Sequence, residues 1–274
     1  MNELVTIDAA KQRELNALLG ANNDSNNDRL AVLKINSKRK DASGRKIAEG
    51  TFVLTGMDEP VYAETVMIRP LAHNFQWLQF DSEALKLTNK TIIVPNFRMD
   101  PIDMKGGLRC GKPPSKVLRE MSKEDQKRYA DIKCYRQVRC LVTYTGKTAD
   151  GTEVTVENKP ALLSLKGANF NPFEDQVMKR LPAGRNLYDY WVKLSTTEHE
   201  NGSVVYYVIK FEPDFGNPVP LDNTTMETMY VIADMISAEN STVKKKHQDA
   251  LYDRQSGDAA LDALDIDLEA FEDE

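Results

Sequence analysis

The chain has 274 residues, of which 41% are hydrophobic and 28% are charged. This composition is typical of a folded globular protein, so it argues against a wholly disordered chain and against a membrane protein. The longest apolar stretch, residues 204–209, is far shorter than the roughly 20 residues that cross a bilayer. We therefore expect one large domain or two small ones, with no membrane contact.

The charges are unevenly distributed along the chain. The formal net charge is −6, but residues 255–274 contain eight carboxylates and neither Lys nor Arg. The rest of the chain holds 36 basic and 34 acidic residues, which leaves a net charge of +2. A mildly basic body with a strongly acidic tail favours a protein that binds a polyanion or docks through its tail.

The cysteines and the N-terminus indicate the compartment. Three cysteines are too few for a disulfide scaffold. The first residues contain no basic segment followed by an apolar run, so we expect no secretory signal. A reducing, cytoplasmic setting fits both observations.

Three regions follow one another along the chain. Residues 1–29 are expected to form an N-terminal arm, with a short helix at 8–19 and a polar, Asn-rich linker at 21–28. Residues 30–254 are expected to form the body, which ends in a long helix. Residues 255–274 are interpreted as a disordered acidic tail, because they cannot bury enough apolar surface to fold alone.

The body is rich in β-branched and aromatic segments bounded by Gly, Pro, Asn or Asp, which predicts many strands. The predicted strands cover residues 30–36, 50–54, 61–68, 74–80, 91–94, 133–145, 153–156, 161–165, 187–196 and 203–211. Helices are predicted at 115–132, in two pieces, at 171–181 and at 222–253. Many short strands with few helices indicate a mainly β (α+β) fold, an OB-like antiparallel barrel enlarged by inserted helices.

Alternation along three predicted strands places an aromatic side chain beside a cation on the less apolar face. The pairs are Tyr135 with Arg139, Trp191 with Lys193, and Tyr206 with Lys210. Single-stranded nucleic acid is bound in this way, because bases stack on aromatic rings while cations follow the phosphates. We expect these six residues to line one continuous groove. The alternative, which applies above all to Trp191, is that the rings cap a second hydrophobic layer under the long helix.

Two clusters of basic residues add to this signal. Residues 98–139 contain twelve Lys and Arg against six Asp and Glu. A second cluster consists of Lys34, Lys38, Arg39, Lys40, Arg45 and Lys46, opposed by Asp41 alone, and its central residues Lys38, Arg39 and Lys40 are predicted site residues. Lys and Arg neutralise phosphates and release counterions, so we expect both clusters to bind nucleic acid. The alternative is that they are solvated loop and helix faces.

A glycine-rich loop at 106–113 carries Arg109 and Lys112. The loop nearly matches the phosphate-loop pattern GxxxxGK[ST], but Pro113 stands where the pattern needs the hydroxyl that binds Mg²⁺. We therefore expect no nucleotide site here. We interpret the loop as one whose two cations lie close to a nucleic-acid backbone.

The sequence offers little for catalysis or metal binding. It contains no GxSxG or HExxH motif and only three His. Cys110, Cys134 and Cys140 lack the paired, close spacing that structural zinc sites use. We expect no catalytic residue, no metal and no other cofactor. The alternatives are an enzyme of nucleic-acid metabolism with an unrecognised site, and an interaction or structural protein that docks through its tail.

The tail combines its carboxylates with four apolar residues at helical spacing, Leu261, Leu264, Leu268 and Phe271. We predict that these four residues bind a partner, while the carboxylates compete with nucleic acid for the basic body. A strand-rich body followed by such a tail resembles the bacteriophage single-stranded DNA-binding proteins of the T7 type. Those proteins pair an OB-fold body with an acidic C-terminal tail.

The resemblance is matched by residue pattern only in the tail, over about 20 residues. In that family the terminal aromatic residue tends to lie at the very end, whereas Phe271 is followed by three acidic residues. The resemblance implies sequence-independent binding of single-stranded DNA in replication and recombination. It also implies tail contacts with a replicative polymerase or helicase, and a location in the host cytoplasm if a phage encodes the chain.

Overall fold

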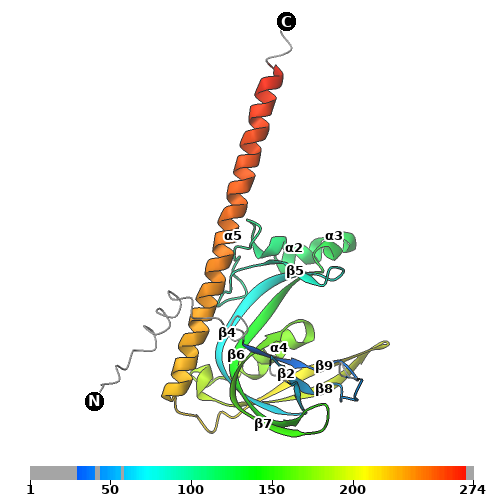
Figure 1. Cartoon of the computed structure of the whole chain (residues 1–274), viewed down its shortest axis with the longest axis vertical. Coiled ribbons are helices and arrows are strands. Elements are labelled where there is room, and N and C mark those ends of the chain that lie inside the picture. The colour runs from blue at the N-terminus through cyan, green and yellow to red at the C-terminus, as the bar shows by residue number, and fades with distance from the viewer. Residues whose placement is uncertain (1–29, 41–43, 57–58, 270–274) are drawn as a thin grey trace, which may run out of the picture.

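One large mixed sheet organises the structure (Figure 1). This computed structural model describes residues 30–40, 44–56 and 59–269, with only the backbone of residues 257–269. The sheet and a few helices confirm the predicted mostly β, α+β class. The predicted N-terminal arm, residues 1–29, lies outside the described residues.

Most elements lie where the sequence predicts them, with different lengths. The strands are β1 (Ala31–Ile35), β2 (Phe52–Thr55), β3 (Val61–Ala63), β4 (Val66–Asp81), β5 (Lys86–Lys90), β6 (Ile132–Lys147), β7 (Glu153–Leu165), β8 (Val192–Asn201) and β9 (Val204–Pro213). The α-helices are α2 (Ser115–Glu120), α3 (Lys123–Arg128), α4 (Phe170–Gln176) and α5 (Asn223–Glu269). Short 3₁₀ segments are η1 (Arg109–Gly111), η2 (Gly167–Asn169), η3 (Met178–Arg180) and η4 (Leu187–Asp189). The strand predicted at 187–196 is therefore wrong at its start, where η4 lies.

Five of the strands are paired in a ring. The sheet order is β3-β2-β1-β7-β6-β4-β8-β9, with β5 joined to β4. β3 also pairs with β6, through Tyr62 and Lys147, so the pairings β1–β2–β3–β6–β7 return to β1. The close approach of β3 to β6 requires Gly146, because a Cβ at that position would clash with the carbonyl oxygen of Tyr62. The strands are not spaced evenly round one axis, so the OB-like barrel stays a prediction.

Alternate residues of the strands fill the main core. Val138, Cys140 and Val142 of β6 are fully buried there, as the alternation predicts. They pack in one cluster with side chains from β1, β2, β8 and β9, among them Leu33 and Phe211. Burial of this apolar surface is the main favourable term in the stability of the fold.

β4 and β6 are each 16 residues long and form one antiparallel ladder. The sequence predicts two separate strands, at 61–68 and 74–80, in the region of β3 and β4. This prediction is wrong because Arg69 and His73, in the gap between the two predicted strands, interrupt the apolar alternation without ending the strand. The far end of the ladder carries a second apolar cluster, which contains Phe75 and Trp77.

α5 covers the outer face of β4 and β6 and continues beyond the sheet (Figure 1). Ile232 packs there against Leu71 and Leu141. The helix has 47 residues and ends at Glu269, well beyond the predicted end at residue 253. Residues 255–269, predicted to belong to a disordered tail, thus continue α5 as helix, and 270–274 lie outside the described residues. Over the part of the chain that is described, no helix is both long and apolar enough to cross a membrane.

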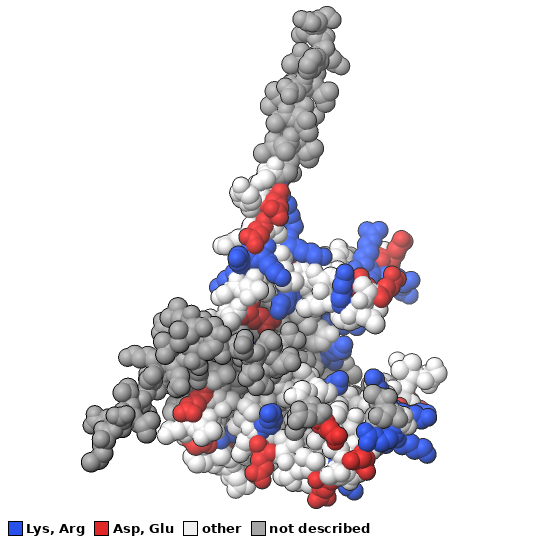
Figure 2. Space-filling view, in the orientation of Figure 1, with Lys and Arg blue, Asp and Glu red and all other residues white. Residues whose placement is uncertain are grey.

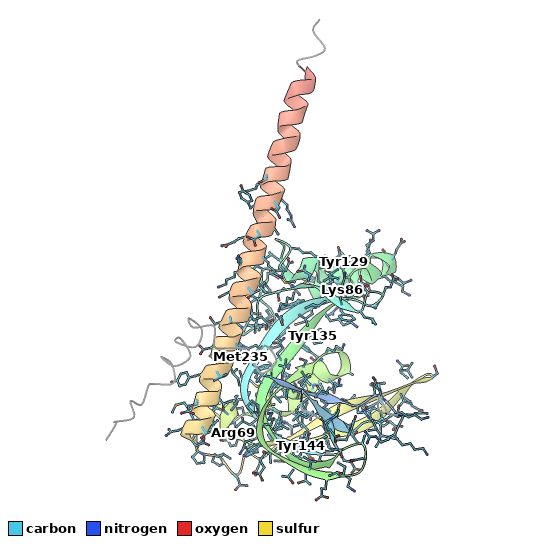
Figure 3. All side chains as sticks on the ribbon, viewed as in Figure 1. Arg69, Lys86, Tyr129, Tyr135, Tyr144 and Met235 are labelled. Atoms are coloured by element: carbon cyan, nitrogen blue, oxygen red, sulfur yellow. The ribbon has the colours of Figure 1, made fainter. Side chains whose placement is uncertain are left out.

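Arg69 of β4 fixes the start of α5 to the sheet (Figure 3). Its buried guanidinium donates to the carbonyl oxygens of Tyr188 at 2.7 Å and Pro220 at 3.0 Å. It also lies 3.7 Å from the carboxylate of Asp222, the residue before α5. One planar group with five donors thus holds the connection that leads into the helix.

Polar contacts also hold the middle of α5 to the edge of the sheet. The Asn240 side chain accepts the N–H of Ile93 at 2.6 Å and donates to the carbonyl oxygen of Ile93 at 3.0 Å. The Lys90 ammonium lies 2.8 Å from the carboxylate of Glu239. These contacts satisfy backbone groups that would otherwise be buried without partners.

Replacing Asn240 by alanine is expected to lower the free energy of unfolding by about 1–2 kcal/mol, because two backbone groups of Ile93 lose their partner. Ser241→Ala, at the neighbouring exposed position, is the matched control. Chemical denaturation of the two variants and the wild-type protein measures the difference. Equal midpoints for the two variants would contradict this role of Asn240.

Candidate nucleic-acid interface

The loop between β1 and β2 is organised by one buried amide. The Asn36 side chain donates to the carbonyl oxygens of Lys38 and Ala48, both at 2.8 Å, and accepts the N–H of Lys38 at 3.0 Å. Lys40 and Lys46 form an isolated antiparallel bridge farther along the loop. These bonds give the loop a defined shape and leave the side chains of Lys38 and Lys40 exposed.

A basic hollow lies beside this loop, on the outer face of β1, β2 and β3. Lys34, Val53 and Tyr62 are cross-strand partners and line it from the sheet. Its other charged lining residues are Lys38, Lys40, Arg45 and Glu59. The hollow has a volume of about 430 Å³, and its described lining holds four cations against one carboxylate. The cations can neutralise phosphates, and the tyrosine ring can stack on a base.

A second, smaller hollow adjoins the basic hollow. Both are lined by Ile35 and Ser37, and the second hollow reaches Tyr206 of β9. Its volume is about 270 Å³. Figure 2 shows Lys and Arg side chains gathered on the side of the molecule where the 36–50 loop and β9 lie in Figure 1. The predicted residues Lys38, Lys40 and Tyr206 are therefore brought to two neighbouring hollows.

Arg39, the third predicted cation of the loop, is paired with a carboxylate. Its Nε lies 2.8 Å from Oε2 of Glu49. The hydrogen bond to Glu49, together with its charge, raises the pKa of Arg39. Because Glu49 lines the second hollow, this pair adds little net charge there.

Lys193, Tyr206 and Lys210 share the outer face of the β8–β9 hairpin. His199 faces Tyr206 across the two strands, and their rings stack with centroids 5.5 Å apart. The Lys210 ammonium lies 2.6 Å from the carboxylate of Glu212, and its hydrogen bond lowers the pKa of Glu212. The three predicted residues of this hairpin are thus exposed on one face, with one of the two cations paired.

Arg139 and Trp191 do not belong to this surface. Trp191 packs in the apolar cluster that contains Ile232 of α5, which confirms the alternative of a second layer under the long helix. Arg139 is 5% exposed and donates to the Gln137 side chain at 2.9 Å, beneath α5. The prediction of one continuous groove through both residues is therefore wrong, because α5 covers this face of the sheet.

Tyr135 lies apart from the hollows, near the start of β6 (Figure 3). The ammonium of Lys166 lies 5.2 Å from its ring centroid and donates to its hydroxyl at 3.1 Å. Tyr135 is partly exposed beside a cation, as the sequence predicts. The cation is Lys166, whereas the predicted neighbour Arg139 is buried.

Arg109 and Lys112 are turned towards the protein. The Arg109 guanidinium lies 5.1 Å from the centroid of Trp77 and 3.2 Å from the carboxylate of Asp100. The Lys112 ammonium donates to the carbonyl oxygen of Ile132, and burial lowers its pKa. Both cations thus stabilise the loop itself, which corrects their assignment as exposed phosphate contacts.

A charged cluster that the sequence did not predict lies between α4 and the β4–β6 ladder. The Arg136 side chain is 1% exposed, with its guanidinium 5.0 Å from the centroid of Phe75 and 4.9 Å from that of Phe170. Its Nη1 lies 2.7 Å from Nε2 of His73 and 2.9 Å from the carboxylate of Glu174. The sequence contains one indication of this cluster. Strand alternation places Arg136 on the inward face of β6, where a cation needs a partner.

His73 makes the stability of the fold sensitive to acid. Burial, together with the charge of Arg136, lowers the pKa of His73 from 6.5 to about 4. Between these two values the unfolded chain binds a proton that the folded protein does not. The free energy of unfolding is therefore expected to fall by about 3 kcal/mol as the pH drops from 6.5 to 4. Denaturant titrations across this range measure the loss.

A variant separates this effect from the titration of carboxylates. His73→Gln should remove most of the loss, because glutamine does not titrate and its oxygen can accept from Arg136. His199→Gln, at an exposed position on β8, is the matched control and should keep the wild-type dependence. An acid-induced loss of the same size in all three proteins would assign it to other groups.

The cysteines lie in packed surroundings. Burial raises the pKa of Cys110 and of Cys134 to about 12. Cys140 is fully buried in the main core. Among the residues that the structure describes, no three His, Cys, Asp or Glu side chains form a group that could hold a metal ion.

The basic hollow contains residues beyond the predicted ones. Tyr62 lines it although the sequence analysis did not name it, and Lys34 and Arg45 line it although they were predicted only as members of the second basic cluster. Lys34 and Arg45 belong to the second predicted basic cluster, so charge density had already indicated them. For Tyr62 the signal is alternation, because it stands between the buried residues Val61 and Ala63 and must point outward.

The tail and the comparisons with known proteins add no further site residue. The side chains predicted to bind a partner, Leu261, Leu264, Leu268 and Phe271, lie outside the described ones, so their role stays a prediction. No protein-family model, no curated protein and no solved structure matches the chain. What the site binds is therefore inferred from its own residues.

Proposed function

We propose that this chain binds single-stranded DNA at the basic hollow, without catalysing a reaction. One observation carries the proposal: the lining of the basic hollow combines several cations with a tyrosine ring. The lining residues concerned are the cations Lys34, Lys38, Lys40 and Arg45, the single carboxylate Glu59, and Tyr62. In this proposal the ring of strands β1, β2, β3, β6 and β7 serves as an OB-like barrel that presents the hollow.

The chemistry of the lining favours a single strand over a duplex. Lysine and arginine neutralise phosphates whatever the base sequence, and both forms of DNA carry phosphates. A tyrosine ring on a sheet face, however, can stack only on a base that is not already stacked inside a duplex. Tyr62 in the basic hollow and Tyr206 at the second hollow supply two such rings in neighbouring positions.

The acidic tail supports a role in replication and recombination. The resemblance to phage single-stranded DNA-binding proteins implies that such a tail contacts a replicative polymerase or helicase. α5 carries the first part of the tail as helix to Glu269 (Figure 1). In the proposal, the apolar residues from Leu261 to Phe271 bind the partner, while the body holds the DNA.

Fluorescence anisotropy with labelled oligo-dT and a duplex of equal length, at several salt concentrations, tests the proposal. We expect tighter binding to oligo-dT than to the duplex. The affinity for oligo-dT should fall as the salt concentration rises. The slope of log affinity against log salt concentration should be about −0.7 for each neutralised phosphate. Equal affinity for the duplex, or no binding at low salt, would contradict the proposal.

An incubation of the same oligonucleotides with the protein and Mg²⁺ separates binding from catalysis. The proposal predicts that the oligonucleotides stay intact. Their cleavage by the wild-type protein would favour the enzyme alternative. Intact oligonucleotides that also fail to bind would leave an interaction protein as the remaining class.

A further inference from the structure

The turn between β5 and η1 presents an aromatic side chain to solvent. Phe97 is 44% exposed, although its ring contacts those of Phe75 and Phe170, with centroids 5.6 and 6.3 Å away. The turn is fixed by the Asn96 side chain, which accepts the N–H of Arg98 at 2.9 Å. The ring is thus supported on one side and open to solvent on the other.

A buried cation stabilises the base of this aromatic group. The guanidinium of Arg136 lies against the rings of Phe75 and Phe170, within 5.0 Å of each centroid, and the carboxylate of Glu174 lies 2.9 Å from it. These contacts fix the rings on which Phe97 rests. A ligand that stacks on Phe97 therefore meets a preorganised surface and orders few side chains on binding.

The net charge beside the exposed ring is positive. The Arg98 guanidinium lies 5.8 Å from the centroid of Phe97. Asp100, the acidic residue of the same turn, is paired with Arg109 at 3.2 Å. Helices α2 and α3, which follow the turn in the chain, together hold five Lys and Arg against three Asp and Glu. An aromatic ring with an adjacent cation, in basic surroundings, is the arrangement that binds single-stranded nucleic acid.

The aromatic group is linked to the second hollow through two neighbouring residues of the chain. Asn169 lines that hollow and directly precedes Phe170 in the chain. Its side chain binds the edge of β9, donating to the carbonyl oxygen of Tyr207 at 3.1 Å and accepting the N–H of Ile209 at 2.6 Å. The hollow residue Asn169 is thus followed directly by Phe170, whose ring centroid lies 6.3 Å from that of Phe97.

We propose that Phe97 and Arg98 form a further stacking position for the same single strand, beyond the two hollows. This inference rests on the proposed function, because it states where a longer strand continues. The positive charge of the turn, where Arg98 lies beside the ring and Asp100 is already paired with Arg109, favours a polyanion over an apolar protein partner as the ligand of the exposed ring. The occupied site is thus longer than the hollows alone.

The length of the oligonucleotide tests the inference. Binding of wild-type protein and of Phe97→Ala is compared for oligo-dT of stepwise increasing length, with thermal unfolding as the check of folding. We expect equal affinities for short strands and about 10-fold weaker binding by Phe97→Ala once a strand is long enough to reach the ring. Phe97→Tyr should retain wild-type affinity, because its ring can still stack.

Two further variants keep the test independent of packing. Arg98→Gln leaves the apolar contacts of Phe97 intact and should weaken only the binding of long strands, by a smaller factor. Met99→Ala removes another exposed apolar side chain of the same turn and should have no effect at any length.

Three results would overturn the inference in distinguishable ways. Equal affinity of Phe97→Ala and wild type at every length, while hollow variants bind weakly, would reject the further position and leave the proposed function intact. A loss of the same size at every length would place Phe97 in the primary site. A wild-type protein that binds no oligo-dT would reject the proposed function and the inference together.

Discussion

Replacing Lys34, Lys38 and Lys40 together by glutamine is expected to weaken oligo-dT binding about 100-fold at roughly 0.05 M salt. The three side chains are exposed and line the basic hollow, so their loss should not disturb the core. Each lysine that neutralises a phosphate contributes about 0.7 to the log–log dependence of affinity on salt. The slope measured by anisotropy should therefore become shallower by about 2.

The matched control removes the same charge from another exposed surface. Lys244, Lys245 and Lys246 follow one another on α5, and all three are exposed. Their replacement by glutamine should leave the slope almost unchanged, because salt screens exposed charges over a Debye length of about 10 Å at 0.1 M. Equal losses in the two triple variants would show that net charge, and not the basic hollow, drives binding.

Replacing Arg136 by alanine is expected to lower the free energy of unfolding by about 3–5 kcal/mol. The change removes a side chain that is 1% exposed and leaves a cavity beside Phe75 and Phe170. It also removes the hydrogen-bond partner of His73 and of Glu174. Urea denaturation at neutral pH measures the loss. A loss below about 1 kcal/mol would contradict the role given to this cluster.

Two variants divide this loss between packing and charge. Arg136→Met keeps an apolar stem of similar length without a donor, so it should cost less than Arg136→Ala. Glu174→Gln removes the carboxylate that compensates the buried guanidinium but keeps a hydrogen-bond acceptor, so it should destabilise the fold by less than Arg136→Ala. If Arg136→Met were as destabilising as Arg136→Ala, the charge and not the packing would carry the effect.

The sequence predicted local features well, because they depend on neighbouring residues. The inward face of β6 followed from the alternation of Val138, Cys140 and Val142. The cap of α3 is local in the same way, since the Ser122 side chain accepts the N–H of Asp125 at 3.0 Å. Both features are decided within a few residues of the chain.

Covered faces could be stated only as an alternative, because they depend on segments far apart in the chain. Alternation gives a strand two faces but does not show which of them a helix will cover. Arg139 and Trp191 therefore looked like groove residues, although α5 buries that face through contacts such as Leu141 with Ile232. The same limit applies to Arg109, whose charge is visible in the sequence but whose partner Asp100 is not.

The site was predicted in part for the same reason. The exposed Lys38 and Lys40 follow from a charged loop, because such a run is rarely buried. Their position next to Tyr206 depends on how β9 lies against the end of β1, which no local pattern encodes. Alternation along β3 predicts that Tyr62 points to the outer face, although the sequence analysis did not name this residue.

The packing of the two tryptophans determines what intrinsic fluorescence can report. The chain has two tryptophans. Trp77 is buried in the second apolar cluster, and Trp191 packs with Ile232 under α5. Neither indole lines the basic hollow, so occupation of the hollow should leave the emission spectrum nearly unchanged. A red shift of the emission would instead record the release of α5 from the sheet, which makes the native chromophores an optical probe of helix docking.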